Sequence, residues 1–371
     1  MYCTLLGSKL SLRETYSLFF TVGGATPVLT ICSLCVTSTQ PNFMMAIGLS
    51  GEVIVDTLMR AACVPEVPLK VPHQNASSLQ VARAQLRPWL DALLLYIGDT
   101  MYHRQRTLGN GISGRVSAYA NRLDLQDEIA VKTPKLDHET AIQHEREILA
   151  KLAEYVKNEP PEARCVIPQL VAYPAGQPLD DKHLCMRPVC ESLQLTVDNY
   201  PALLHDLVTA IFIAAQCGIV HRDVRVANIM ASNGHAVLLD WAFAVYVDAA
   251  SGTVTAFYEG TVSTASQRVL QSLRSGQSTV EVGFADDAQS LVKAVWRMGL
   301  QLSKLHVPPP HVEPVVDNAT RWHQWWENVV AQHSTCREAE QAALGCRRAD
   351  WALYVELERS LTTMFRKVFV L

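Results

Sequence analysis

The sequence has little excess charge of either sign. Its 32 Lys and Arg residues stand against 36 Asp and Glu residues, which gives a formal net charge of −4 at pH 7. No cluster of Lys and Arg follows one predicted face, whereas proteins that bind nucleic acids usually carry such a basic patch. We therefore expect no nucleic-acid partner.

The sequence also lacks a long uninterrupted apolar run. Residues 16–36 carry no charge, but Gly23, Gly24 and Pro27 divide them, and this composition is typical of two strands and a turn rather than of a membrane helix. We expect no stable membrane insertion. The alternative interpretation of the same segment is a cryptic secretion signal.

Paired metal-binding cysteines are absent as well. Of the ten cysteines, the one close pair is Cys32 and Cys35, and no second Cys or His pair follows at ligand spacing. The other cysteines are scattered through apolar segments. This usage predicts buried, reduced thiols and a cytoplasmic or nuclear protein.

What the chain does have is enough apolar sequence for two domains: 371 residues, of which 49% are hydrophobic. Residues 1–97 form a first region, small and β-rich, and residues 98–371 form a second. The first region is either a small regulatory or dimerising module or the remnant of a larger domain. Four strands are predicted in it, at 18–22, 28–36, 43–49 and 52–58, followed by a Pro-rich linker at 64–72 and a helix from Ser77 or Ser78 toward Tyr96.

The most informative stretch of the second region is a predicted β-hairpin. Two short apolar runs flank Asn233-Gly234, the dipeptide best suited to the positive φ angles of a type I′ turn. Counting outward from this turn places Asn228 and Asp240 at the same end of the hairpin, and Asp223 lies in the loop that leads to that end. Such oxygen-bearing side chains bind Mg²⁺ and accept protons from hydroxyl groups. The hairpin therefore indicates phosphoryl transfer.

A glycine-rich segment precedes the hairpin by about a hundred residues. It reads LGNGISGRV from Leu108 to Val116, with glycines at 109, 111 and 114. A loop without β-carbons lets backbone N–H groups close over phosphates. Taken alone, the pattern equally fits an ordinary hairpin turn.

Two charged residues in apolar surroundings follow this loop. Lys132 ends an apolar strand at 128–133, and Glu145 lies on the apolar face of a helix that Asp137 is expected to cap. A charge on a buried face requires a partner of opposite sign. The sequence therefore predicts an ion pair between Lys132 and Glu145.

Further elements follow from the same patterns. A strand pair is expected at 166–173, a buried helix at 203–217 that ends at Gly218, and a mobile surface segment at 246–260. Another helix begins at Asp286-Asp287, where one aspartate caps the helix and the other accepts bonds from buried backbone N–H groups. The chain ends in helices at 322–330 and 351–370, whose aromatic residues are expected in the core.

These residues together resemble the eukaryotic protein-kinase family from about Arg106 to the C-terminus. The resemblance rests on five motifs in the expected order. They are Gly109, Gly111, Gly114 and Val116 as the glycine-rich loop, Ala130-Val131-Lys132 as the strand lysine, Glu145 as its helix partner, His221-Arg222-Asp223 with Asn228 as the catalytic loop, and Asp240-Trp241-Ala242 in place of Asp-Phe-Gly.

The resemblance implies an α+β, bilobal fold with a β-rich N-lobe at about 102–184, a mainly helical C-lobe at about 190–371 and ATP in the cleft. Leu108, Ala130 and Met186 would line the nucleotide site together with the glycine loop. Lys132 would contact the phosphates, and Asn228 and Asp240 would hold Mg²⁺. The implied activity is an ATP- and Mg²⁺-dependent protein kinase.

In the same family, Asp223 would orient the substrate hydroxyl and accept its proton. Arg225 stands where serine/threonine-specific members usually carry lysine, and it keeps the positive charge there. Serine or threonine is therefore the expected acceptor. The identity of the protein substrate and the oligomeric state are not legible from the sequence.

Departures from the family pattern fall in two places. Trp241 and Ala242 replace Phe and Gly, which is expected to restrict switching of this loop. Arg268 stands near the position where the family's Ala-Pro-Glu motif supplies a glutamate, and we expect an acid of the last helix, Glu356 or Glu358, to pair with it.

Some details resemble the divergent fungal-type protein kinases and the kinase domains of oomycete crinkler effectors. They are Asp286-Asp287, the Trp-Ala after Asp240, and Arg187-Pro188-Val189. A crinkler relationship would imply secretion and action in a host nucleus. Two other functions fit the same residues: a pseudokinase that binds nucleotide as an interaction module, and a small-molecule kinase of the aminoglycoside or choline type.

Overall fold

The structure is a computed structural model that describes residues 15–21, 28–37, 40–42, 94–172, 183–193, 195–248, 251–303 and 314–370. The chain divides into two compact units. The first comprises Met1–Asn110, Val116–Ile129 and Tyr173–Leu179, and the second comprises Gly111–Arg115, Ala130–Ala172 and Asp180–Leu371.

The first unit contains two groups of strands. Near the N-terminus, β1 (Thr15–Thr21) pairs antiparallel with β2 (Val28–Thr37), whose end pairs with β3 (Gln40–Asn42). The strands predicted at 18–22 and 28–36 are thereby confirmed. Those predicted at 43–49 and 52–58 lie outside the described residues, as does most of the helix expected before Tyr96.

The second group begins where the sequence predicts the end of that helix. β4 (Leu94–Ile97) instead pairs antiparallel with β5 (Thr100–Asn110), so Tyr96 lies opposite Met101 in a hairpin. The helix prediction is wrong at this end because Gly98, with φ 62°, makes a tight turn that brings β5 back along β4. β5 is in turn a neighbour of β6 (Gly114–Asn121).

β9 (Leu184–Arg187) pairs antiparallel with both β7 (Glu128–Pro134) and β8 (Gln169–Leu170), in a six-stranded sheet of order β4-β5-β6-β7-β9-β8. The strand pair expected at 166–173 is wrong: only β8 forms there, and its partner is β9. Val166 and Ile167 are buried in the core instead, and the Val166 carbonyl accepts a hydrogen bond from Leu238 N at 3.1 Å.

The long helix α3 (Glu139–Val156) follows β7 and buries one face, which includes Ile142, Leu149 and Leu152 as predicted. Asp137 is not its cap. That residue adopts a left-handed conformation with φ 66°, and the helix begins after His138 without a side-chain capping bond.

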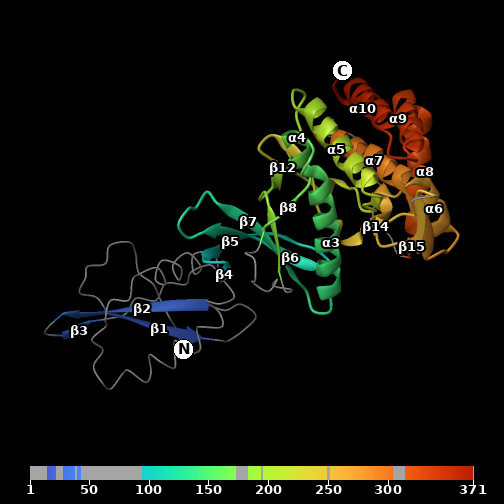
Figure 1. The fold of residues 1–371 in the computed structure, drawn as a ribbon. Coiled ribbons are helices and arrows are strands. Elements are labelled where there is room, and N and C mark those ends of the chain that lie inside the picture. The colour runs from blue at the N-terminus through green and yellow to red at the C-terminus, as the bar shows by residue number, and fades with distance from the viewer. Residues whose placement is uncertain are drawn as a thin grey trace. The chain divides into compact units, whose positions relative to one another are not determined.

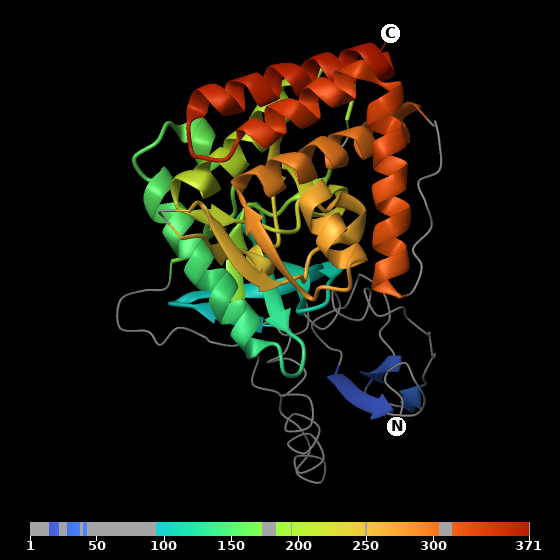
Figure 2. The same cartoon turned by 90° about the vertical axis from the view of Figure 1, so that its right-hand side faces the viewer.

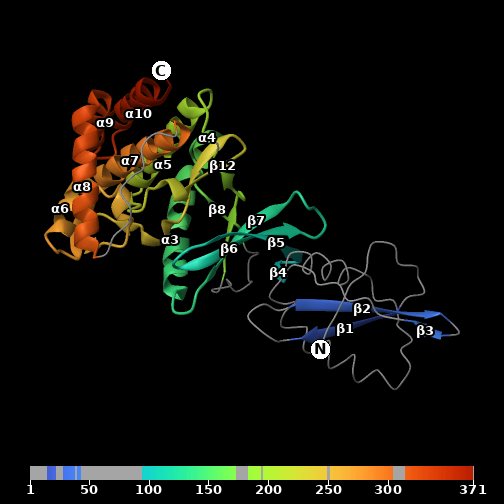
Figure 3. The same ribbon diagram turned by 180° about the vertical axis from the view of Figure 1, so that it is seen from behind.

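The helices of the second unit pack mainly on one another (Figure 1). The buried helix α5 (Tyr200–Gln216) ends before Gly218, whose φ of 70° stops it as predicted. α10 (Trp351–Phe365) packs on α5 and α9 (Ser334–Gly345), and α9 packs on α7 (Phe284–Ser303). α6 (Gln267–Arg274) and α8 (Val315–Gln332) lie side by side (Figure 3). Two short helical turns, α4 (Pro161–Arg164) and η4 (Arg366–Val370), are also present.

The two final predicted helices are found, but not all their aromatic residues are in the core. Trp322 and Trp326 are buried, whereas Trp351 is 37% exposed at the start of α10. α9 was not predicted, because the apolar residues on its buried face are small, Cys336, Ala339 and Ala343, and give a weak hydrophobic period.

The segment expected to be mobile, 246–260, contains regular structure. β15 (Thr253–Phe257) pairs antiparallel with β16 (Thr279–Gly283) over five residues, and β16 in turn lies next to α6 (Figure 2). The prediction is wrong because the pairing partner lies more than twenty residues further along the chain. Val280 and Val282 of β16 are buried and anchor this strand pair to the core.

Arg268 has a different partner from the one predicted. Its guanidinium contacts Glu281 of β16 at 3.2 Å and also pairs with Asp286 at the start of α7. Glu356 pairs with Arg359 of its own helix, and Glu358 contacts His205 at 3.0 Å. The prediction of an acid from the last helix is wrong because the segment that joins β16 to α7 brings two other acids beside Arg268.

We expect Arg268→Met to lower the free energy of unfolding by about 1 kcal/mol, because the guanidinium is partly exposed and solvent weakens its ion pairs. Glu356→Gln and Glu358→Gln should stay within about 0.5 kcal/mol of the parent. Urea titrations of the three variants measure the difference. Equal stability of all three would contradict the pairing with Glu281 and Asp286.

Candidate active site

The predicted hairpin forms as expected. β12 (Ile229–Ser232) pairs with β13 (His235–Leu238), and Ser232 lies opposite His235. Asn233 and Gly234 have φ values of 51° and 83°, as a type I′ turn requires. At the other end, Leu239 N donates to Asn228 O at 2.8 Å, which holds the two chain segments together where Asn228 and Asp240 emerge.

Lys132 is the centre of a buried group of charges. Its Nζ lies 2.7 Å from Glu145 Oε2 and 2.6 Å from Asp240 Oδ1, and the residue is only 4% exposed. The predicted ion pair with Glu145 is confirmed, and the contact with Asp240 extends it to the end of the hairpin. Burial alone would lower the pKa of Lys132, but attraction by the two carboxylates outweighs burial and raises this pKa. Lys132 is therefore held as a cation.

Glu145 also fixes the segment after the hairpin. Its Oε1 accepts a hydrogen bond from Trp241 N at 3.1 Å. One residue earlier on α3, His144 Nε2 lies 2.6 Å from the Ala244 carbonyl oxygen. Burial raises the pKa of Glu145, and Lys132 opposes that rise. These contacts tie α3 to both ends of η2 (Trp241–Phe243).

Trp241 is fully buried beneath this group. Its indole N–H donates to Leu238 O at 2.9 Å, and its ring meets the His221 ring edge-on with centroids 4.4 Å apart. The residue before it, Asp240, has a left-handed backbone with φ 64°. The tryptophan thus packs beside an aspartate with a strained backbone.

His221 is a neutral structural residue. Its Nδ1 accepts a hydrogen bond from Asp223 N at 3.2 Å, so its Nε2 carries the proton and donates to Leu239 O at 3.0 Å. Burial lowers the pKa of His221 and favours this neutral form. The imidazole therefore joins the loop before the hairpin to its last strand.

Asp287 holds the same loop from below. Its carboxylate accepts bonds from His221 N at 2.5 Å and Arg222 N at 2.9 Å, which confirms the predicted inward role. Burial raises the pKa of Asp287 to about 7, and the two N–H donors oppose the rise. Asp286 is not the helix cap: it is the third residue of α7 and accepts from Gly283 N at 2.7 Å.

Asp223 is buried and engaged on both carboxylate oxygens. Oδ1 accepts from Thr261 N at 3.0 Å, and Oδ2 accepts from Asn228 Nδ2 at 2.9 Å and lies 3.1 Å from Arg225 Nε. Asn228 Nδ2 also donates to the Asp223 carbonyl oxygen at 2.9 Å. The amide nitrogen of Asn228 is thus committed to Asp223, which leaves its side-chain oxygen as the atom suited to a cation.

Sequence reasoning missed two contacts here. The first is the Thr261 N–H on Asp223, which only the folding of a segment 38 residues away supplies. The second is the backbone contact of Arg222, which has φ 72° and donates to Phe243 O at 3.1 Å. No local pattern signals either contact.

The glycine loop is tightly built at its end. Gly111 N donates to Gly114 O at 2.9 Å, and Lys135 N donates to Ser113 O at 3.0 Å. A β-carbon on Gly114 would lie 2.6 Å from the Thr133 carbonyl oxygen, next to Lys132, whereas one on Gly109 would meet nothing within 4 Å. Backbone approach therefore requires glycine at 114.

We expect Gly114→Ala to lower the free energy of unfolding by about 1–3 kcal/mol, because a backbone carbonyl must move to admit the methyl group. Gly109→Ala is the matched control and should change stability by less than about 0.5 kcal/mol. Thermal unfolding of the two proteins measures the difference. Indistinguishable melting would contradict the close approach.

The remaining predicted nucleotide-contacting residues fall into two groups. Ala130 and Met186 lie directly opposite each other in the β7–β9 pairing of the second unit, both buried. Leu108, Gly109 and Val116 belong to the first unit, in β5 and β6.

The oxygen donors fit a magnesium ion that completes its coordination with phosphate. Within the described residues there is no group of three or more His, Cys, Asp and Glu side chains that could hold a metal by itself. Mg²⁺ usually takes one or two carboxylates plus substrate phosphates and water. The Asp240 carboxylate and the free oxygen of Asn228 supply such a partial set.

The strands and helices form an α+β fold of the protein-kinase class, with a strand-rich part followed along the chain by a mainly helical part. A solved structure of vaccinia related kinase 3 is similar to this chain, with a TM-score of 0.53 and 14% sequence identity. The match covers 74% of this chain and 90% of the other. No family model and no curated protein matches the sequence. Among the described residues, no helix has the length and apolar character needed to cross a membrane.

Proposed function

We propose that this chain is an ATP- and Mg²⁺-dependent protein kinase that phosphorylates serine or threonine. The observation that carries the proposal is the Lys132 cation between two carboxylates, Glu145 and Asp240, in the same compact unit as the Asp223–Asn228 pair. Phosphoryl transfer relies on positioning and on neutralising phosphate charge. A fixed lysine, a fixed base and two free oxygen donors match that requirement.

Each residue has a defined task in this proposal. Lys132 binds phosphate oxygens, and Glu145 keeps it in place. Asp223 orients the acceptor hydroxyl and takes its proton, while Arg225 supplies positive charge beside it. Asn228 and Asp240 would hold Mg²⁺, which neutralises charge on the phosphates when bound. Leu108, Gly109, Gly111, Gly114, Val116, Ala130 and Met186 would enclose the nucleotide.

The choice of serine or threonine rests on Arg225 and on the segment Gly260-Thr261. Thr261 N holds Asp223 Oδ1, so this segment lies against the proposed base, where an extended peptide would present its hydroxyl. The division at about residue 97 into an N-terminal region and a kinase domain belongs to the same proposal. So do a cytoplasmic or nuclear location and a relationship to fungal-type or crinkler kinases.

Two alternatives have specific support. Trp241 and Ala242 favour a pseudokinase, because a packed tryptophan in place of the usual residue limits the loop's movement. The Asp-Trp sequence at 240–241 is also common in small-molecule kinases of the aminoglycoside or choline type. Against the second stands the Gly260-Thr261 segment, which offers a peptide platform.

Transfer of the ATP γ-phosphate separates these functions. We expect the full chain with Mg²⁺ to phosphorylate a generic protein substrate but not a panel of small alcohols. Asp240→Asn should lose transfer, and so should removal of Mg²⁺ with a chelator. Nucleotide binding without transfer would replace the proposal with the pseudokinase, and phosphate found only on small alcohols would replace it with the small-molecule kinase.

A further inference from the structure

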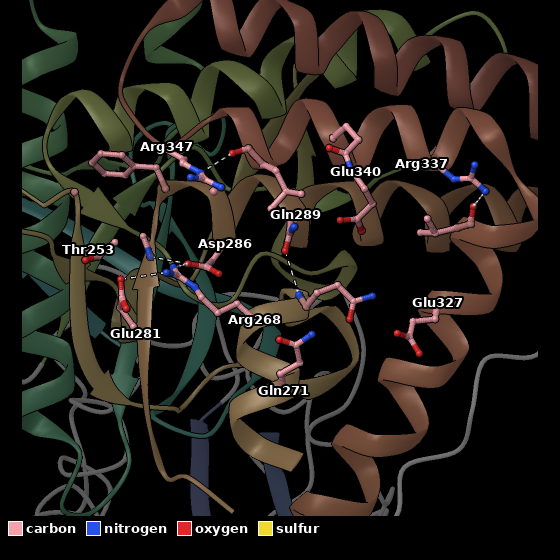
Figure 4. Close-up of a pocket in the computed structure, with 18 of the residues that line it drawn as sticks. Thr253, Arg268, Gln271, Glu281, Asp286, Gln289, Glu327, Arg337, Glu340 and Arg347 are labelled. Atoms are coloured by element: carbon pink, nitrogen blue, oxygen red, sulfur yellow. Dashed lines mark hydrogen bonds and ion pairs between the residues drawn. The ribbon is translucent and has the colours of Figure 1, made fainter. Parts of the chain in front are cut away.

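A cavity of about 790 Å³ opens in the helical part of the second unit (Figure 4). Its walls come from α6, α8, α9, the start of α7 and the β15–β16 strand pair. Lys132, Asp223 and Asp240 do not line it. The cavity is large enough to take more than a single side chain, so it is a candidate binding site in its own right.

The three arginines of this cavity already have partners. Arg337 donates to two carbonyl groups at the end of α8, each at 3.3 Å, and Arg347 donates to Leu344 O at 3.2 Å at the end of α9. Arg268 is held by the two acids of β16 and α7. The positive charges of the cavity are therefore used to cap helices and to neutralise acids.

Glu340 is the acid that lacks a partner. It is 6% exposed and lines the cavity from α9, on the side where Figure 4 also shows Gln289 of α7. Its Oε1 is buried without a hydrogen bond in the described part of the chain. A buried carboxylate without a donor is costly, and this cost falls when a cation binds to it.

Lys293 is the cation whose charge acts on Glu340, but it does not donate the hydrogen bond that Glu340 lacks. Lys293 is fully buried, and its Nζ donates to Ala265 O at 2.5 Å and lies 5.4 Å from the centre of the Trp326 ring. Its attraction opposes the rise that burial causes in the pKa of Glu340. Lys293 thus attracts the Glu340 carboxylate without forming a hydrogen bond to it.

The walls beside Glu340 carry free amide groups. Gln271 of α6 and Gln341 of α9 are exposed, line the cavity and make no side-chain hydrogen bond to a described residue. Side-chain amides can donate to and accept from peptide groups at once. An acid at the base and amides on the walls match a short peptide better than a simple ion.

We propose that this cavity binds a peptide segment that carries an arginine or lysine, with the cationic head group on the Glu340 carboxylate. The guanidinium or ammonium group supplies the donors that Glu340 lacks, and Gln271 and Gln341 bind the peptide backbone. This site is separate from the phosphoryl-transfer residues and stands whether or not the chain is a kinase.

Fluorescence anisotropy of the full chain tests the proposal. The probe is a dye-labelled peptide, Gly-Gly-Arg-Gly-Gly with blocked termini, and its control replaces arginine with citrulline, which keeps the shape and removes the charge. We expect the arginine peptide to bind at least about tenfold more tightly than the citrulline peptide. This ratio corresponds to the contribution of a hydrogen bond to a charged group in a buried site. Equal binding of the two peptides would overturn the proposal.

Two variants of one helix assign the binding to Glu340. Glu340→Gln should weaken binding of the arginine peptide at least about tenfold. Glu338→Gln removes the same charge from an exposed position of α9 that does not line the cavity, and it should leave the affinity within about twofold of the parent. Equal affinities of the two variants would exclude Glu340 as the acceptor.

A third variant guards against a folding effect, because Glu340→Gln also alters the surroundings of Lys293. Gln341→Lys places a cation on the exposed wall, leaves Glu340 in place and should weaken the arginine peptide while the melting temperature stays that of the parent. An unchanged affinity would contradict the site. A blocked arginine amide that binds as tightly as the peptide would overturn the peptide part and leave a site for small cations.

Discussion

Asp223→Asn is expected to reduce the turnover number for phosphate transfer by about 10²- to 10⁴-fold, the range over which a positioned general base contributes. The substitution keeps the size of the side chain but removes the atom that takes the proton. It also turns an amide nitrogen toward Asn228 Nδ2 or Thr261 N, both of which donate to the carboxylate in the parent. KM for ATP should change little, because the nucleotide is assigned to other residues.

The matched control is Asp206→Asn. Asp206 is a buried carboxylate near the turn of the same hairpin, where it accepts from Ala236 N at 2.8 Å. Its replacement should lower the melting temperature without changing the turnover number of the folded protein. If both variants lost stability and neither lost turnover, Asp223 would be a structural residue and the proposed mechanism would fail.

Trp241→Ala is expected to lower the free energy of unfolding by about 3–5 kcal/mol, the cost of removing a fully buried aromatic side chain. The ring lies against His221, its indole N–H satisfies the Leu238 carbonyl, and its backbone N–H satisfies Glu145. A cavity at this point would loosen the lysine, the acid of α3 and the loop before the hairpin together. The variant should therefore also lose nucleotide affinity, which calorimetry on the folded protein measures.

Two further substitutions calibrate this result. Trp241→Phe keeps most of the packing but loses the hydrogen bond from the indole N–H. That loss should lower the free energy of unfolding by about 1 kcal/mol, in addition to the cost of the smaller ring. Trp351→Ala removes an exposed tryptophan that packs on Phe212, with an expected cost of about 1 kcal/mol. A Trp241→Ala protein as stable as Trp351→Ala would show that the tryptophan does not organise this region.

The contacts of Arg222 bear on regulation of the proposed kinase. Arg222, next to the proposed base, is already engaged by two backbone carbonyls and faces Glu259, an exposed acid at 3.7 Å. The β15–β16 pairing holds the intervening segment in place. The arrangement therefore gives Arg222 a negative partner that needs no added phosphate.

The charged centre and the hairpin could be predicted from the sequence because each depends on a local pattern with a chemical requirement. Asn233-Gly234 demands one turn type, and that turn sets the register that brings Asn228 and Asp240 together. A lysine in an apolar strand and a glutamate on an apolar helix face each require a partner, so their pairing followed from burial alone.

Contacts between residues that are distant in sequence could be read only from the tertiary structure. The strand partner of 253–257, the acids beside Arg268 and the Thr261 N–H on Asp223 all come from segments whose local composition signals nothing. The cavity around Glu340 belongs to the same class, because its walls are gathered from several elements far apart in the sequence. Local periodicity and the cost of burying a charge determine which residues need partners; only packing of the whole chain determines which partners they meet.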